Sequence, residues 1–571
     1  MSATPDDRSR PPREERRRVT RRELLRSAGI GAAAVPLAGL AGCSDPDDPT
    51  ADASGVASDA TDRATQPTTS STQLADAAGT PARDGATPPA VSRQIMHRDP
   101  VRLPRDGAGN GMNVIVVILD SLRRDHVGAY GNRRIHTPSI DELARSSTRF
   151  TEARPEAMPT VQVRRCVHTG ERAFPTRRWY PRKGDSVRMP GWEPIGEDQV
   201  TLAEMLSAAG YYTALVTDTP HLFKPSMNFH RGFDTWSFVR GQQGDRFRPA
   251  RASSDPELQR YLSALPAGSS RAEALAQYAA GRGARNREQD HQAPKVFREA
   301  TSWLRDAVKL QPFLMVVDSY DPHEPWDPPA SYVRRYDDPD FRGPEPIAPE
   351  YGSADYLAPR QRRRMQALYS AEVTLADAWL GRFLDAVDRR GLLDNSLVVF
   401  LSDHGVLLGE HGLVGKPLSS SLWPEVTDIP LLMRQPERRR SRSDDRLVST
   451  HDIVPTILGA LGIPASRPLG GIDLSPVLSG DGGRVSRRSH LTMGYGPNAQ
   501  IRLGRWALTT TADGSSRQLY DVREDPGFTT DVSGRHRDVV RELVDVIERD
   551  AGGPLPVHDT GAVAARLGAR P

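Results

Sequence analysis

Short runs of apolar, mostly β-branched residues recur along the chain from residue 113 onward. The first is Asn113-Val-Ile-Val-Val-Ile-Leu119, and similar runs lie at 211–216, 313–317, 397–401 and 429–433. Apolar side chains are nearly continuous in each run and do not alternate with polar ones. This pattern is typical of strands that are buried on both faces, so we predict strands at these five places.

Helical patterns separate these runs. Thr201-Leu-Ala-Glu204 has the form of a capping box, in which each of the two end residues bonds to the backbone of the other. Residues 295–310 and 368–390 carry apolar side chains at helical spacing. Strands that alternate with helices predict an α/β fold, with a large, mostly parallel sheet and helices on both of its faces. Functional side chains then gather at the carboxyl ends of the strands.

The first 43 residues have the pattern of an export signal. Arg21-Arg22 precedes an apolar stretch, 28–41, that is too short to span the hydrocarbon core of a bilayer. An arginine pair in this setting indicates export through the twin-arginine pathway. The stretch ends in Leu40-Ala-Gly-Cys43, which resembles a lipobox, so we expect a cell-surface lipoprotein anchored through Cys43. The alternative is an exported protein without an anchor, in which Cys43 is incidental.

Composition limits the remaining choices. Of the 571 residues only 37% are hydrophobic, which excludes an integral membrane bundle. The net charge is only +3, which gives no sign of a nucleic acid partner. Residues 44–111 are rich in Asp, Ala, Thr, Ser, Pro and Gly without apolar periodicity, so we predict a disordered linker. The only cysteines are Cys43 and Cys166, which cannot build a disulfide scaffold.

Metal-ligand side chains follow two of the predicted strands. Asp120 comes directly after the first run, and Asp403-His404 comes shortly after the run 397–401. Two carboxylates and an imidazole that meet at one edge of a sheet suit a single divalent cation. Each of these residues alone could also be a helix cap or a turn residue.

Ordered motifs extend from Asn113 to Pro526. They are Asn113–Gly128, His136–Asp141, Tyr369–Glu372, Gly391–Gly405, Gly409–Lys416, Asp452–Thr456, Leu519–Asp521 and Asp525-Pro526. In this order they resemble the sulfatase family of the alkaline phosphatase superfamily. The resemblance implies a catalytic domain over 112–480 and a small C-terminal antiparallel sheet with a helix over 481–550, followed by a tail over 551–571.

At the nucleophile the chain departs from the family pattern. Sulfatases usually carry Cys-x-Pro-x-Arg or Ser-x-Pro-x-Arg, in which the first residue is oxidised to formylglycine. Counted back from Thr169-Gly170, the corresponding stretch is Thr160-Val-Gln-Val-Arg164, and Cys166 falls on the helix interior. Threonine cannot form formylglycine, and Thr160 is instead similar to the metal-activated threonine of the phosphate-handling branches. Arg164 would orient the nucleophile or stabilise the anionic ester; the alternative is a surface arginine on a helix.

The resemblance also implies the metal. Asp120, Asp403 and His404 would hold one divalent ion against the Thr160 hydroxyl. Ca²⁺ is the default ion of the family. Here Ser121 replaces a second aspartate and His404 replaces the frequent asparagine, and the change from an anionic to a nitrogen ligand favours Mn²⁺ or Zn²⁺.

Three further residues match family positions that contact the ester group. His323 follows the run 313–317, and Lys416 is one of only five lysines in the chain. His221 lies where a Lys-x-His pair is expected, but the lysine position is Thr219. Either Lys224 supplies this charge from one turn away or the charge is missing.

We therefore expect an exported sulfatase-family hydrolase that cleaves a sulfate or phosphate ester of a small molecule or glycan through Thr160. His323 or His221 would be the general acid. One alternative is a phospho-group transferase that acts on a surface glycan or lipid, and another is a non-catalytic surface binding protein. A two-metal site would need further ligands such as Asp321, His323 and His451, whose spacing does not form the required cluster.

Overall fold

A computed structural model gives the structure of the protein. It describes residues 109–177, 179, 187, 189–224, 226–250, 254–418, 422–436 and 441–558. The expected signal with Arg21, Arg22 and Cys43, most of the expected linker, and residues 559–571 of the expected tail lie outside the described residues. The described residues all belong to one compact unit, and the division into 112–480 and 481–550 stays a prediction.

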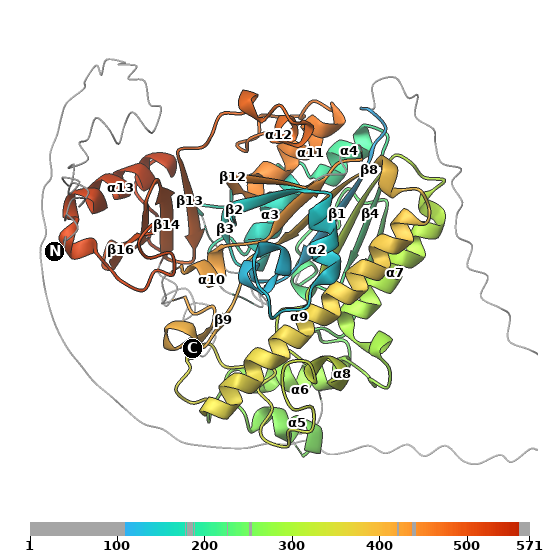
Figure 1. Cartoon of the computed structure of the whole chain (residues 1–571), viewed down its shortest axis with the longest axis vertical. Coiled ribbons are helices and arrows are strands. Elements are labelled where there is room, and N and C mark those ends of the chain that lie inside the picture. The colour runs from blue at the N-terminus through green and yellow to red at the C-terminus, as the bar shows by residue number, and fades with distance from the viewer. Residues whose placement is uncertain are drawn as a thin grey trace, which may run out of the picture. The chain divides into compact units, whose positions relative to one another are not determined.

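An eight-stranded sheet in the order β12-β2-β11-β8-β1-β6-β4-β5 forms the larger part of the fold (Figure 1). Its strands are β1 (Asn113–Leu119), β2 (Thr148–Arg154), β4 (Tyr212–Thr217), β5 (Thr235–Phe238), β6 (Phe313–Ser319), β8 (Ser396–Ser402), β11 (Leu431–Arg434) and β12 (Arg442–Ser449). The strands from β8 to β5 are parallel to one another, whereas β11 is antiparallel to both of its neighbours. The prediction of a mostly parallel sheet with strands at the five apolar runs is confirmed.

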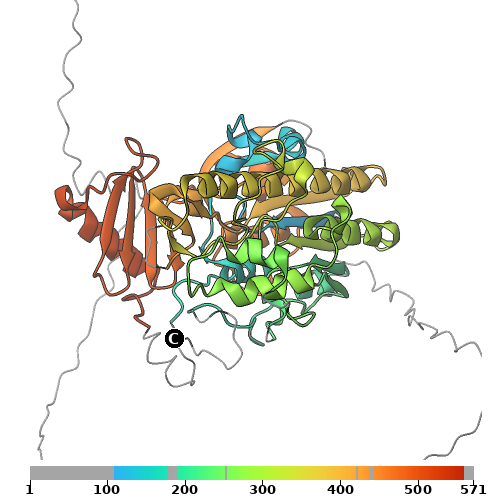
Figure 2. The same ribbon diagram turned by 90° about the horizontal axis from the view of Figure 1, so that it is seen from below.

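Helices cover both faces of this sheet, as expected. Alternate side chains of β1 point to opposite faces, so Ile115 and Val117 enter one apolar core while Val114 and Val116 enter the other. The first core is closed by α2 (Pro138–Arg145), α7 (Gln292–Ala307) and α9 (Pro359–Asp388), the second by α3 (Thr160–Thr169), α4 (Leu202–Ala208), α11 (Ile453–Leu461) and α12 (Ser475–Ser479). Figures 1 and 2 both show α7 and α9 side by side.

The helix boundaries agree with the sequence patterns in most places. At α4 the Glu204 N–H donates to the Thr201 hydroxyl at 3.1 Å and the Thr201 N–H donates to the Glu204 carboxylate at 2.8 Å, which confirms the capping box. The expected helix 295–310 corresponds to α7. The expected helix 368–390 is only the second part of α9, because the arginine-rich segment 359–364 hides the apolar spacing of its first turns.

A second, five-stranded sheet has the order β16-β15-β14-β13-β3. Its strands are β3 (Ala157–Met158), β13 (His490–Tyr495), β14 (Asn498–Leu503), β15 (Trp506–Thr511) and β16 (Arg517–Asp521). The strands from β13 to β16 are antiparallel and pack against α13 (Arg537–Asp550), which confirms the expected C-terminal sheet and helix (Figure 2). The parallel pairing of β3 with β13 was not expected, and it joins this sheet to the segment just before α3.

The remaining α-helices and strands of the described residues are mostly short. They are α5 (Pro256–Leu262), α6 (Arg271–Gly281), α8 (Ala330–Val333), α10 (Pro424–Thr427) and the small sheet of β7 (Gly352–Ser353), β9 (Leu407–Leu408) and β10 (Leu413–Gly415). Among the helices of the described residues, none combines the length and the apolar character that crossing a bilayer requires.

His168 lies in the last turn of α3 and is buried, and its ring contacts Phe229 and Phe233 edge-on at centroid distances of 5.4 and 5.9 Å. Burial, with a contribution from Arg164, lowers the pKa of His168 to about 3. The unfolded chain therefore binds a proton at a pH where the folded chain does not, and stability is lost as the pH falls below the unfolded pKa of about 6.5.

Because of His168, the free energy of unfolding of the wild type should fall by about 2 kcal/mol between pH 7 and pH 5, since each pKa unit corresponds to about 1.4 kcal/mol. We expect this contribution to be absent in His168→Leu. Denaturant unfolding of both proteins at the two pH values measures this difference. His136→Leu changes an exposed histidine and is the control. Equal pH dependence in wild type and His168→Leu would contradict the prediction.

Candidate active site

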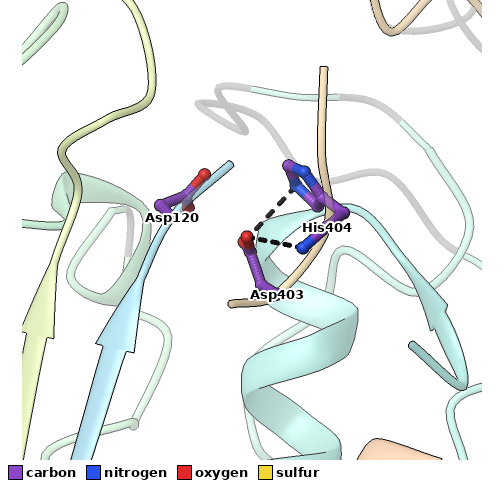
Figure 3. Close-up of side chains that lie close together, drawn as sticks. All are labelled: Asp120, Asp403 and His404. Carbon is purple, nitrogen blue, oxygen red and sulfur yellow. Dashed lines mark hydrogen bonds and ion pairs between the residues drawn. The ribbon is translucent and has the colours of Figure 1, made fainter. Parts of the chain in front are cut away.

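Three metal-ligand side chains meet at the carboxyl ends of two neighbouring strands. Asp120 follows β1, and Asp403 and His404 follow β8, which pairs with β1 in parallel. Figure 3 shows these three side chains close together. Their ligand atoms lie within 4.8 Å of one another, and all three side chains are fully buried. Elsewhere in the described residues no group of three His, Cys, Asp or Glu side chains is this compact.

The chemistry of these three side chains fits a divalent cation. Asp120 Oδ2 and His404 Nε2 are buried and make no hydrogen bond within the described residues; their polar neighbours are Arg164 Nη1, 3.0 Å from the former, and Asp403 Oδ2, 3.3 Å from the latter. Asp403 is oriented by the N–H groups of Ser121 and His404, which donate to its Oδ1 at 2.8 and 2.7 Å. Burial and the nearby Asp403 carboxylate raise the pKa of Asp120 well above its usual range. A divalent cation would offset this repulsion between buried carboxylates.

Arg164 lies beside these ligands and is fully buried, so the alternative of a surface arginine is wrong. Its Nη1 contacts Asp403 and lies 3.0 Å from Asp120 Oδ2. Its Nε and Nη2 donate to the two oxygens of Asp318 at 3.1 and 2.7 Å. Asp318 lies at the end of β6 and was not singled out in the sequence, although it follows a buried apolar run in the same way as Asp120.

Thr160 is the first residue of α3 and is 2% exposed. It precedes Arg164 by four residues, so both side chains lie on the same face of the helix. Within the described residues no hydrogen bond joins the Thr160 hydroxyl to the metal-ligand group. Cys166 is buried inside the helix, as expected, with its Sγ 3.6 Å from a Glu156 oxygen.

The two candidate acids, His221 and His323, meet at a tyrosine. The hydroxyl of Tyr320 lies 3.1 Å from His323 Nε2 and 3.4 Å from His221 Nε2. On the other side of His323, Nδ1 lies 2.8 Å from the carbonyl oxygen of Glu324 and 3.3 Å from its carboxylate. Two acceptors at Nδ1 place the proton there, so the neutral His323 accepts from Tyr320 through Nε2. Because Tyr320 has one proton, its contact with His221 requires His221 to donate.

Both histidines are neutral in the folded protein near neutral pH. Burial, with Lys224 and Arg164, lowers the pKa of His221 to about 3. Burial lowers the pKa of His323 well below its usual range, although Glu324 acts in the opposite direction. Tyr320 and Glu324 were not expected at the site from the sequence; the only available signal was that they flank the family histidine.

Lys416 lies on the other side of Ser121 and is 5% exposed. Its Nζ donates to the Ser121 hydroxyl at 3.3 Å and lies 5.3 Å from the centre of the Tyr351 ring. Burial opposes its charge, but Tyr351, Glu324 and Asp120 outweigh burial and raise its pKa. Lys416 is therefore a buried ammonium ion at this site.

Glu324 balances part of this positive charge. Tyr351 donates to its carboxylate at 2.5 Å, and Arg271 lies 3.1 Å from the same oxygen. Arg271 and Tyr351 come from stretches of sequence that gave no interpretable pattern, and nothing in the sequence would have identified them.

The remaining candidate side chains bond to groups other than the three metal ligands. The Lys224 amine donates to the carbonyl of Gly244 at 2.8 Å, while Thr219, at the expected lysine position, reaches Asp318 at 3.5 Å. Asp321, a ligand of the two-metal alternative, accepts hydrogen bonds from Gln242 and Ala293 at 2.6 and 2.9 Å. His451 contacts the Ser449 hydroxyl at 2.9 Å. None of these side chains joins the group of Asp120, Asp403 and His404.

Comparisons with known proteins agree with this arrangement. The chain is 23% identical to an ulvan-active sulfatase of Formosa agariphila, over 74% of this chain and 77% of that protein. It is also 23% identical to an arylsulfatase of Clostridium perfringens, over 74% and 90% of the two chains. Among solved structures, a phosphonate monoester hydrolase of Agrobacterium radiobacter has a TM-score of 0.59 at 21% identity, covering 77% of this chain and 96% of its own. The sulfatase family model matches residues 112–463, more than half of the chain. The family usually binds a divalent metal. The protein is therefore a hydrolase of the sulfatase family.

Proposed function

We propose that this sulfatase-family hydrolase cleaves a sulfate ester of a small molecule or glycan through the hydroxyl of Thr160, without formylglycine. The observation that supports the proposal is the register of α3. Arg164 binds Asp120 and Asp403 directly, and Thr160 lies one helical turn before it on the same face. The nucleophile and the metal ligands would thus be held by one helix and two strand ends.

The reaction is an in-line transfer in two steps. The Thr160 oxygen attacks the sulfur and gives its proton to solvent, and the bond from sulfur to the leaving oxygen breaks as that oxygen takes a proton from a histidine. Water then attacks the sulfur of the Thr160 ester and gives a proton to the same histidine. The bond from sulfur to the threonine oxygen breaks, that oxygen takes a proton from solvent, and sulfate leaves. A divalent ion held by Asp120, Asp403 and His404 would lower the pKa of an adjacent hydroxyl and offset charge on the ester oxygens.

The chain supplies the proton and the remaining positive charge. The leaving oxygen takes a proton from His323 or His221, whose pKa values rise when an anionic ester binds beside them. Lys416 has three N–H donors, one of which donates to the Ser121 hydroxyl. We assign the ammonium group of Lys416 the role of binding the ester oxygens. The guanidinium of Arg164 already pairs with three carboxylates, so Arg164 acts by orienting α3.

A phosphate or phosphonate monoester is the second candidate substrate. Threonine instead of a formylglycine precursor, and histidine instead of asparagine among the metal ligands, favour it, and a phosphonate monoester hydrolase is among the structural neighbours. The burial of all the candidate site side chains in one place argues against a non-catalytic binding protein. Twin-arginine export and a lipid anchor at Cys43 stay predictions. Cell fractionation of an Arg21→Lys, Arg22→Lys double variant would test the first, and of a Cys43→Ala variant the second.

We expect Thr160→Ala to lower turnover by roughly a thousandfold or more while substrate still binds, because no attacking oxygen remains. Thr160→Ser keeps a hydroxyl and is the matched control, with most of the activity retained. Turnover is measured with aryl sulfate, phosphate monoester, phosphodiester and phosphonate monoester side by side. Intact mass after brief reaction should show one added sulfuryl or phosphoryl group on the peptide that contains Thr160. An adduct on Cys166, or full activity of Thr160→Ala, would refute the assignment.

Tyr320→Phe removes the hydroxyl between the two histidines but keeps the ring. The Tyr320 hydrogen bond stabilises the neutral form of His323, so its loss should raise the pKa of His323. The alkaline limb of the kcat profile, on which the general acid loses its proton, should then move to higher pH. We expect kcat to fall by about 10- to 100-fold with little change in KM, as for a positioning residue. Tyr211→Phe, at another buried tyrosine, is the control. A lower melting temperature with an unchanged pH profile would show that Tyr320 is only structural.

Purified full-length protein should contain about one divalent ion per chain, and Asp403→Asn or His404→Ala should abolish it, because an incomplete ligand set binds metal weakly. Elemental analysis measures the ion and identifies it. His168→Leu, at a buried histidine outside the group, should keep the metal. Two tightly bound ions per chain, or no loss in either ligand variant, would count against a single site.

A further inference from the structure

Two large aromatic side chains are strongly exposed beside the candidate active site. Trp236 is 50% and Phe247 is 44% exposed, whereas the other rings of the described chain are mostly covered. Exposed apolar groups of this size cost free energy in water, so a group of them marks a surface that binds something.

The exposed rings belong to a connected set. Phe223 stacks on Phe238 at 4.5 Å and lies 5.4 Å from Trp236, and His230 lies 5.2 Å from Trp236. The Arg240 guanidinium covers Phe238 at 5.1 Å and Phe247 at 4.9 Å. We call this set the aromatic surface; it consists of Phe223, His230, Trp236, Phe238, Arg240 and Phe247.

The aromatic surface begins at the rim of the candidate site. Phe223 follows His221 by two residues. Phe238 pairs with Thr217 at the carboxyl end of β4, the strand that leads to His221. Trp236 and Phe238 are two residues apart in the edge strand β5 and so share one face of the sheet. A chain bound on this surface would therefore run toward the edge of the sheet where the ester group is expected.

Positive charge is interleaved with these rings. Arg240, Arg246 and Arg248 are exposed, and Arg248 lies 5.4 Å from the Phe247 ring. Two acids pair with these arginines: Asp245 is buried in a pair with Arg240, and Glu273 pairs with Arg246, so the three arginines exceed these acids by one positive charge. Arginine presents donors suited to sulfate and carboxylate groups and also stacks on flat rings.

We propose that the aromatic surface binds the sugar rings of an anionic, sulfated oligosaccharide whose ester group enters the candidate active site. Sugar rings have apolar C–H faces that stack on aromatic rings, and their sulfate groups pair with guanidinium ions. This inference rests on the proposed function, because it assigns the leaving group of the same reaction to a glycan. Rings with arginines among them also occur at protein interfaces, so self-association is one outcome of the test below.

The test measures binding to full-length Thr160→Ala protein, in which turnover does not interfere. Tetrasaccharides of heparin, chondroitin sulfate, carrageenan and ulvan, each with its desulfated form, are titrated by calorimetry. At least one sulfated tetrasaccharide should bind, and Trp236→Ala should weaken it by about tenfold or more. Arg240→Ala should weaken the sulfated form more than the desulfated form. The controls are Val308→Ala, an exposed apolar residue, and Arg484→Ala, an exposed arginine.

Three results would overturn the inference. They are binding of no tetrasaccharide, equal losses in Trp236→Ala and Val308→Ala, and a concentration-dependent dimer in sedimentation that Trp236→Ala abolishes. Failure of the proposed function is separate, since it would appear as equal turnover by wild type and Thr160→Ala on the small aryl and phosphonate esters. Binding that depends on Trp236 would survive that outcome.

Discussion

A single buried guanidinium, that of Arg164, joins the parts of the candidate site. It pairs with Asp120, Asp318 and Asp403, which lie at the carboxyl ends of three adjacent central strands. Removing one partner from a buried ion pair typically costs about 3 to 5 kcal/mol. Helix α3 is therefore fixed against β1, β6 and β8, and Thr160, one turn before Arg164, is fixed with it.

The charges at the site suit an anionic ester. Two buried cations, Arg164 and Lys416, face more carboxylates than they can neutralise, and the histidines remain uncharged because they are buried. The excess negative charge is concentrated at Asp120 and Asp403, where a divalent cation fits. The positive charge of Lys416 is held on the opposite side of Ser121, where it can meet the substrate.

The C-terminal sheet supports this site from the side. β3 pairs with β13 and ends just before Pro159, so the start of α3 is held by both sheets. The Tyr495 hydroxyl donates to the carbonyl of Lys416, and the Asn498 amide donates to that of Leu418 at 2.6 Å. The segment that carries Lys416 is thus positioned by residues about 80 positions later in the chain.

The sequence by itself determined the local elements: the five buried strands, the capping box at Thr201, and the places of Asp120 and Asp403 just after two of these strands. Local periodicity and helical spacing suffice for these, and they also place Thr160 and Arg164 on one face of α3. Only the tertiary structure decided the pairing of Arg164 with Asp318, the bridge of Tyr320 between two histidines, the edge strand β5 and the contact of β3 with the second sheet. These depend on residues about 100 or more positions apart, or on strands too short or too polar to show a pattern, so no local signal in the sequence could identify them.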